Sequence, residues 1–234
     1  MEEIKQRYLS LLPDLPRWVE TRDLLLWEGS VVLENSSRSG FIVWSEEDAL
    51  GAVVGEPDPV VLARAAKDVS ELLAFSENIM QVRSLLPGFL AESATIYSAP
   101  AQLPSSPAHI CRKIGQREIS SLRHLSADLL EELSDAAEDG RAVVAALDGG
   151  LPVSFAYVAS ETETLWDVSI DTIESHRRQG YAAAAVLYLM RLMRRKRKAA
   201  VWGALESNHA SSNLARRLGF TENDKLWVLT SSGA

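Results

Sequence analysis

The sequence predicts an α/β protein with two domains. Three observations predict this class: β-prone runs alternate with segments of helical periodicity, the 234 residues can form one large or two compact cores, and a proline-rich stretch lies near the middle of the chain. Hydrophobic residues make up 47% of the chain and charged residues 24%, as in ordinary globular proteins. This composition excludes disordered, collagen-like and coiled-coil chains.

Charge and cysteine content exclude several classes of function. The formal net charge of −8 disfavours a protein that binds nucleic acid or another polyanion. The single cysteine, Cys111, forms no intrachain disulfide and no multi-cysteine metal site, so we expect a reducing, cytoplasmic environment and no metal. We identify neither a secretory signal nor the run of about 20 apolar residues that spans a bilayer, and therefore expect no membrane partner.

The amino-terminal half contains the pattern of an α/β layer. Residues 41–44 and 50–55 are short β-prone runs, and the Glu-Pro-Asp-Pro sequence at 56–59 forms a rigid turn after the second run. Apolar residues then recur at three- and four-residue steps, which predicts a helix over 60–76. This half contains no motif that indicates a particular chemistry.

A connector separates the two halves. Residues 98–107 include Pro100, Pro104 and Pro107, which interrupt helices and remove backbone donors. We therefore predict a smaller α/β domain over residues 1–107 and a second domain over 108–234.

The elements of the carboxyl-terminal half can be assigned in order. Ser126 has the character of a helix cap, and Gly140 ends that helix. Strands over 141–147 and 151–159 form a hairpin through an Asp-Gly-Gly turn, and a third strand follows over 165–172.

The turn after the third strand carries the chemistry. Residues 173–182 read Ile-Glu-Ser-His-Arg-Arg-Gln-Gly-Tyr-Ala, and a helix is predicted over 181–198. The first amides of a helix lack intrahelical partners and carry partial positive charge, so they can hold a phosphate. Gly180 permits close approach of an anion, while Arg177 and Arg178 add charge-assisted donors.

The residue pattern of this turn is found in a known superfamily. Neither a Walker loop nor a dinucleotide fingerprint is present, and the pattern that is present is Arg177-x-x-Gly180-x-Ala182. It resembles the coenzyme A loop of the GNAT superfamily of acyl-CoA-dependent N-acyltransferases, whose pattern is [QR]xxGx[GA]. The sequence from Thr172 to Ala182 most resembles that of the glycine N-acyltransferase-like branch.

The residues after the predicted helix are similar to the tail of the same superfamily. In that tail a strand is followed by an asparagine, a helix with a small hydroxyl residue, and a Gly-Phe pair before the last strand. The matching positions here are the strand over 199–205, Asn208, Ser211, Gly219-Phe220 and the strand over 225–230. The resemblance covers about residues 116–234.

The resemblance implies a fold, a cofactor and a reaction. The fold is a mixed-sheet GNAT domain, preceded by a smaller domain that can be interpreted as a degenerate GNAT-like half. The reaction is direct transfer of an acetyl group from acetyl-CoA to a primary amine of a small molecule or amino acid, by a monomer or homodimer. The residues implied to contact the coenzyme are Ile170, Thr172, Arg177, Arg178, Gln179, Gly180, Tyr181, Ala182, Asn208 and Ser211.

Individual contacts follow from the same resemblance. The backbone of Ile170 and Thr172 would pair with the pantetheine amides as an extra strand, and residues 178–182 would surround the diphosphate. Asn208 and Ser211 would face the coenzyme, or would serve only to cap the following helix.

Two residues of the superfamily pattern are missing. Many GNAT enzymes have a tyrosine four residues before the Gly-Phe pair, where it can protonate the departing thiolate, and the glycine N-acyltransferase relatives have a glutamate eleven residues before the motif arginine. These two positions are Ala215 and Trp166 here. The nearest carboxylate belongs to Asp167, which we take as the candidate catalytic base. In a regular strand it points to the face opposite Trp166, so it serves only if a bulge shifts the strand's phase.

Other interpretations remain open. Asp171 shares the face of Asp167, Glu206 and His176 are further candidate bases, and solvent can also take the proton from the amine. A non-catalytic acyl-CoA-binding or sensor protein is the alternative function. The basic cluster over 191–198 complements the dipole at a helix end and contains no aromatic residues for base stacking, so we expect no nucleic-acid partner.

Overall fold

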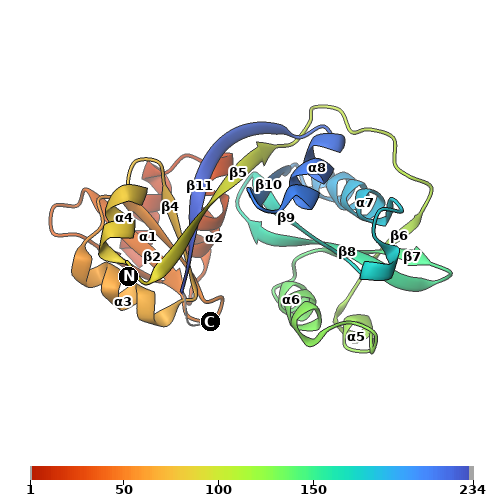
Figure 1. Cartoon of the computed structure of the whole chain (residues 1–234), viewed down its shortest axis with the longest axis horizontal. Coiled ribbons are helices and arrows are strands. Elements are labelled where there is room, and N and C mark those ends of the chain that lie inside the picture. Colours follow the sequence, from red (N-terminus) through yellow and green to blue (C-terminus); the bar gives the residue numbers. More distant parts are fainter. Residues whose placement is uncertain (1, 232–234) are drawn as a thin grey trace. The chain divides into compact units, whose positions relative to one another are not determined.

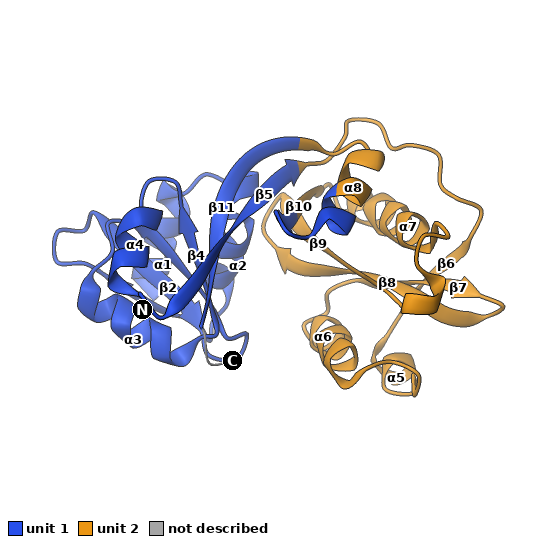
Figure 2. Cartoon of the chain, in the orientation of Figure 1, with its two compact units in different colours: residues 1–97, 203–212, 222–234 blue, residues 98–202, 213–221 orange. Residues whose placement is uncertain are grey.

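The computed structural model describes residues 2–231, which divide into two compact units (Figure 2). Unit 1 comprises the described residues of 1–97, 203–212 and 222–234, and unit 2 comprises 98–202 and 213–221. Unit 1 thus contains two segments that the sequence assigns to the second domain, and it is about as large as unit 2. The cause is the last strand, which pairs within unit 1 and not with the segments that precede it along the chain.

Unit 1 is a mixed sheet flanked by helices (Figure 1). Its strand order is β1-β2-β3-β4-β11-β5. The first three strands are antiparallel neighbours, β3 and β4 are parallel, and β4 pairs antiparallel with β11. The elements are α1 (Glu2–Leu11), α2 (Val19–Leu26), β1 (Val31–Glu34), β2 (Gly40–Ser45), β3 (Leu50–Gly55), α3 (Pro59–Asp68), β4 (Glu71–Phe75), α4 (Ile79–Leu85), β5 (Phe89–Ser98) and β11 (Thr221–Ser231).

The strands of unit 2 have the order β10-β9-β8-β7-β6. Neighbours from β6 to β9 are antiparallel, whereas β9 and β10 are parallel and are connected by α7. Both β10 and α8 contribute residues to the two units. The elements are β6 (Ile110–Ile114), α5 (Gln116–Ile119), α6 (Ala127–Glu138), β7 (Val143–Asp148), β8 (Leu151–Glu161), β9 (Leu165–Thr172), α7 (Tyr181–Arg195), β10 (Ala199–Leu205) and α8 (His209–Arg217).

The same order of elements occurs twice along the chain. Two helices are followed by three antiparallel strands, a helix, a parallel strand, a helix and a final strand, first from α1 to β5 and then from α5 to β11. In each repeat a helix, α3 or α7, connects the third strand to its parallel neighbour. No sequence repeat indicates this arrangement, so the structure establishes a repeat that the sequence does not show.

Most local predictions for the second half are confirmed. Ser126 caps α6 by accepting a hydrogen bond from the Leu129 amide at 3.3 Å, and Gly140 follows the helix with a φ of 74°. The hairpin of β7 and β8, the third strand and the start of α7 at Tyr181 all lie where the sequence predicts them. The turn that carries the chemistry is therefore held between β9, whose last residues are partly buried, and a long helix.

One predicted helix is wrong in its second part. The sequence predicts a helix over 60–76, but α3 ends at Asp68 and residues 71–75 form β4. Four consecutive residues of this strand, Leu72 to Phe75, are buried between its neighbours β3 and β11. A strand buried on both faces is apolar throughout, and a short run of this kind also fits a helical stripe.

The long helix of unit 2 is anchored by its apolar face. Its residues Leu187, Leu189, Met190 and Met193 are almost completely buried. On the other side of the sheet, α6 packs through Leu133 against buried residues of β7 and β8. This packing fixes the beginning of α7 next to the end of β9.

Candidate functional site

The edge of β9 is open along its second half. Its parallel pairing with β10 joins Leu165–Asp167 to Ala199–Val201 and stops there, while its pairing with β8 continues to Thr172. Within the described residues, β10 does not pair with residues 168–172 of β9. Five further residues of strand span roughly 16 Å at about 3.3 Å per residue, which is enough for an extended chain to lie alongside.

The direction of the backbone groups on this edge follows from one hydrogen bond. The Ile173 amide donates to the Val153 carbonyl on β8 at 2.9 Å. The backbone groups of alternate residues point to alternate sides of an antiparallel strand, so those of Asp171 point to β8 and those of Ile170 and Thr172 point to the open edge. The sequence analysis singled out these same two residues for pairing with pantetheine. The Thr172 carbonyl already accepts a hydrogen bond from Nε of Arg177.

The turn after β9 has the backbone geometry of an anion site. Arg178 and Gly180 both have positive φ angles, of 62° and 93°. Gly180 is the N-terminal cap of α7 and supplies no side chain to the first amides of the helix. Successive amides in such a left-handed turn at a helix start form a concave site for phosphate.

Side chains of the turn stabilise it from within. Arg177 donates from Nε to the Thr172 carbonyl at 3.1 Å, and Gln179 donates to the Ser175 carbonyl at 3.0 Å. The guanidinium group of Arg177 therefore connects the turn to the end of β9. Arg177, Arg178 and Gln179 are all exposed to solvent, so an anion could reach them.

The reason for glycine at position 180 differs from the prediction. A Cβ atom built on Gly180 lies 3.3 Å from Nε2 of His109 and 3.5 Å from Cβ of Pro107. The positive φ and these protein contacts already require glycine, without a phosphate on that side. The anion must instead approach the side to which the amides point.

The other two predicted coenzyme contacts cap a helix. Asn208 accepts a hydrogen bond from the Ser211 amide at 3.0 Å at the start of α8. Both residues lie in the segment 203–212, which is assigned to unit 1, whereas residues 170–182 lie together in unit 2. The cap accounts for Asn208 structurally, and contact of this pair with the coenzyme stays a prediction.

The candidate base lies on the helix α6 side of β9. At the bulge between β8 and β9, Val158 pairs with Val168 and Glu161 pairs with Trp166. The chain thus advances by three residues in β8 and by two in β9. The extra residue belongs to β8, so β9 keeps its alternation and Asp167 points away from the face of Trp166. The phase shift on which we made its role conditional is therefore absent from β9.

Asp171 shares this face and has an altered acidity. Its carboxyl group is about half buried, and burial raises its pKa, as does the negative charge of Glu132 on α6. The positive charge of Arg177 acts in the opposite direction. Tyr157 lies on the same face and donates a hydrogen bond to Glu132.

The remaining candidates are engaged elsewhere. Glu206 forms an ion pair with Lys225 at 2.5 Å, and the hydrogen bond from Lys225 lowers the pKa of Glu206, which makes it a weak base. His176 places Nε2 3.3 Å from a carboxylate oxygen of Asp148. Burial raises the pKa of the Cys111 thiol to about 11, so this cysteine is not a ready nucleophile at neutral pH.

Comparison with known proteins now identifies the second half. Residues 116–229 match the GNAT acetyltransferase family. This segment contains the open strand edge, the left-handed turn and the uncapped helix described above. Residues 116–229 form a GNAT acetyltransferase domain. The predicted enzyme class is therefore confirmed, whereas nothing distinguishes the glycine N-acyltransferase-like branch, which stays a prediction.

Solved structures extend the likeness to the whole chain. A GCN5-related N-acetyltransferase-like protein from Streptococcus suis 89/1591 is 16% identical, with 98% of this chain and 99% of that chain covered and a TM-score of 0.74. A GCN5-related N-acetyltransferase from Kribbella flavida is 17% identical over 92% of this chain and 94% of its own, with a TM-score of 0.64. No curated protein matches the chain.

A third structural likeness concerns the repeat. A tandem GNAT protein from the clavulanic acid biosynthesis pathway is 12% identical, with 100% of this chain and 96% of that chain covered and a TM-score of 0.60. Identities this low establish the fold alone. The fold prediction is confirmed, including a GNAT-like first half, because the likeness covers α1 to β5 as well as the GNAT domain.

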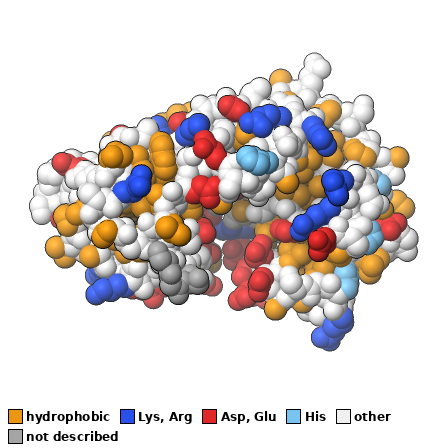
Figure 3. Space-filling view, in the orientation of Figure 1, with side chains coloured by type: hydrophobic (Ala, Val, Ile, Leu, Met, Phe, Trp, Pro, Cys, Tyr) orange, Lys and Arg blue, Asp and Glu red, His pale blue; other side chains and the backbone are white. Residues whose placement is uncertain are grey.

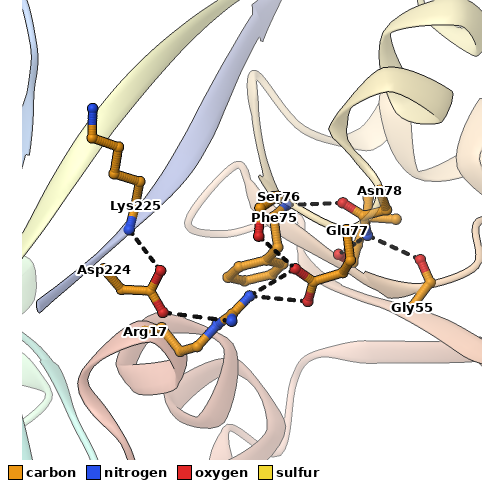
Figure 4. Close-up of polar contacts among 9 residues, drawn as sticks. Arg17, Gly55, Phe75, Ser76, Glu77, Asn78, Asp224 and Lys225 are labelled. Atoms are coloured by element: carbon orange, nitrogen blue, oxygen red, sulfur yellow. Dashed lines mark hydrogen bonds and ion pairs between the residues drawn. The ribbon is translucent and has the colours of Figure 1, made fainter.

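In the first repeat, a side chain occupies the strand edge that stays open at β9 in the GNAT domain. Asn78 follows β4 and is buried, and its amide nitrogen donates to the carbonyls of Val53 at 2.8 Å and Gly55 at 3.0 Å on β3 (Figure 4). Its side-chain oxygen accepts from the Phe75 amide at 2.8 Å. One side chain thus satisfies the groups that correspond to the open edge in the second repeat.

The helix start of the first repeat is also filled. Asp58 caps α3 and accepts from the amides of Val60 at 2.9 Å and Val61 at 3.1 Å. Pro57 and Pro59 supply no backbone donors, and the carboxylate repels an anion. Near Asn78, Arg17 holds Glu77 at 2.9 Å and Asp224 at 3.5 Å (Figure 4). Among the described residues of the first repeat, neither the open strand edge nor the uncapped helix start of the GNAT domain recurs.

Other functional sites find little support in the part of the chain that is described. Within residues 2–231, no three His, Cys, Asp or Glu side chains group as metal ligands, and no helix is long and apolar enough to cross a membrane. In the basic cluster, Arg194 donates to the Pro100 carbonyl at 2.6 Å and Lys198 pairs with Glu161 at 2.7 Å. On the face drawn in Figure 3, Lys and Arg side chains are spread over several places and do not form one stripe.

Proposed function

We propose that the protein is an acetyl-CoA-dependent N-acetyltransferase that acts on a primary amine of a small molecule or amino acid. The observation that carries the proposal is the open edge of β9 beside the uncapped start of α7. An extended chain with two amides fits the edge, and a diphosphate fits the helix start. Acetyl-CoA joins both chemical features in one molecule.

The chain's own residues would bind the coenzyme mainly through backbone. Ile170 and Thr172 would pair with the amides of the pantetheine arm, and the amides from Gly180 onward would hold the diphosphate. Arg178 is exposed and would add a charge-assisted contact. An arm extending from this turn along β9 runs toward Asp167, where the pairing with β10 ends.

Bound acetyl-CoA would supply an activated acyl carbon, to which the amine nitrogen bonds as the carbon–sulfur bond breaks and the thiol is released. The protein's contribution is alignment, because holding the two reactants together accounts for much of the acceleration in such transfers. Solvent is the proposed acceptor of the amine's proton, because β9 keeps its alternation and Asp167 does not meet the condition set for a catalytic base. Ala215 is buried at the position of the missing tyrosine, so no side-chain acid acts there.

Release of free thiol from acetyl-CoA, followed across a panel of primary amines, tests this function. We expect release that requires both the protein and a particular amine. A protein that binds acetyl-CoA and protects the thioester without turnover on any amine would instead be the non-catalytic binding or sensor protein. Mass spectrometry of the acetylated product would identify the acceptor.

A further inference from the structure

Pro107 at the end of the connector and His109 just before β6 lie against the turn that the proposed function assigns to the diphosphate. Nε2 of His109 is 2.9 Å from the carbonyl oxygen of Gln179, although 70 residues separate the two in sequence. The imidazole ring also contacts the ring of Tyr181 in a tilted arrangement, with 4.0 Å between ring centroids and an interplanar angle of 33°. Pro107 and the same imidazole are the nearest atoms to a Cβ built on Gly180. All of these residues belong to unit 2.

The hydrogen bond from His109 fixes the orientation of one peptide group. A carbonyl oxygen only accepts, so Nε2 of His109 carries the hydrogen. The described peptide bonds are all trans, and in a trans peptide the carbonyl and the N–H point in opposite directions. Because the Gln179 oxygen is held toward His109, the Gly180 N–H is directed away from His109, toward the concave side of the turn.

A second set of contacts holds the residue that follows. Desolvation raises the pKa of the Tyr181 hydroxyl, as does the carboxylate of Asp148, the last residue of β7. His176 lies on the same carboxylate, with 3.3 Å between Nε2 and an Asp148 oxygen. The ring of Tyr181 is therefore in contact with both His109 and His176.

We propose that His109 is a positioning residue for the diphosphate, acting through the Gly180 amide that it orients. The inference rests on the proposed function, because it assigns a role toward the same coenzyme. His109 itself does not contact the reacting atoms. The connector thus forms part of the coenzyme site, a role that its proline-rich sequence does not indicate.

Three variants of the full chain separate the parts of this contact. His109→Ala removes both the hydrogen bond and the ring contact with Tyr181. His109→Phe keeps a ring in contact with Tyr181 but has no donor, and His109→Gln keeps an N–H donor without the ring. Calorimetry measures binding of coenzyme A and of pantetheine, which has no diphosphate. Thermal unfolding reports whether each variant remains folded.

Loss of one net hydrogen bond corresponds to about a fivefold change in an equilibrium constant. We expect the Ala and Phe variants to bind coenzyme A about fivefold more weakly, with pantetheine binding unchanged and the Gln variant close to the wild type. Wild-type affinity for coenzyme A in the folded Phe variant, or equal losses for coenzyme A and pantetheine, would overturn the positioning role. A wild-type protein that binds no coenzyme A would overturn the proposed function itself.

Discussion

Replacement of Gly180 by alanine separates backbone strain from coenzyme binding, because the chain offers a matched control. Gly150 has the same φ of 93°, but a Cβ built there meets nothing within 4 Å, whereas at Gly180 it meets His109 at 3.3 Å. Placing alanine in the left-handed region costs about 1 kcal/mol at either position. Each variant should therefore lose about 2–4 °C in melting temperature, as expected for a chain of this size.

Only the Gly180 variant should affect coenzyme A. The new methyl group pushes against the imidazole of His109 and shifts the amides at the start of α7. Loss of one hydrogen bond to a charged group costs about 1.5 kcal/mol, which is about tenfold in Kd. Denaturant unfolding and calorimetric titration with coenzyme A measure the two effects. Equal affinities of folded Gly180→Ala and Gly150→Ala for coenzyme A would contradict the predicted shift of the amides at the start of α7.

Three further predictions follow from the site and its repeat. Because Asp167 lies on the face opposite Trp166, Asp167→Asn should leave turnover and coenzyme A affinity unchanged, and a loss of turnover of about 100-fold would instead identify Asp167 as the base. Asn78→Ala should lower the free energy of unfolding by about 3 kcal/mol in urea titrations, since it leaves two buried backbone groups and one partly buried group without their partner; no measurable loss would contradict the occupation of the strand edge by Asn78. Because burial raises the pKa of Cys111 from 9.0 to about 11, alkylation at pH 8 should be about 100-fold slower in the folded protein than in urea, and the difference should shrink as the pH rises toward 11. Equal rates at pH 8 would show that the thiol is not buried as described.

The parts of the fold that sequence predicts well are those set by neighbouring residues. The strand over 165–172 and the helix start at Tyr181 depend on local alternation, a glycine and a cap, and both lie where predicted. The strand β4 depends on pairing with β3 and β11, which are distant in sequence, and it was therefore mistaken for the end of a helix. Its apolar run fits either structure.

The candidate site divides in the same way. The Arg177-to-Ala182 pattern is local and locates the turn, and the open edge at Ile170 and Thr172 follows from the resemblance. The contact of His109 with Gln179 has no local signal, because it depends on the path of a connector 70 residues earlier. The role of Asn78 also has no local signal in the sequence. Its hydrogen bonds to backbone groups of β3 and β4 form only when these two strands lie side by side.

Calorimetric titration of the 234-residue chain with coenzyme A measures how many coenzyme sites it contains. The open edge of β9 and the uncapped start of α7 predict binding at one repeat, while Asn78 and Asp58 close the other. We expect a stoichiometry of one coenzyme A for each chain. Absence of binding would contradict the assignment of the site, and two equivalents for each chain would contradict the closure of the first repeat.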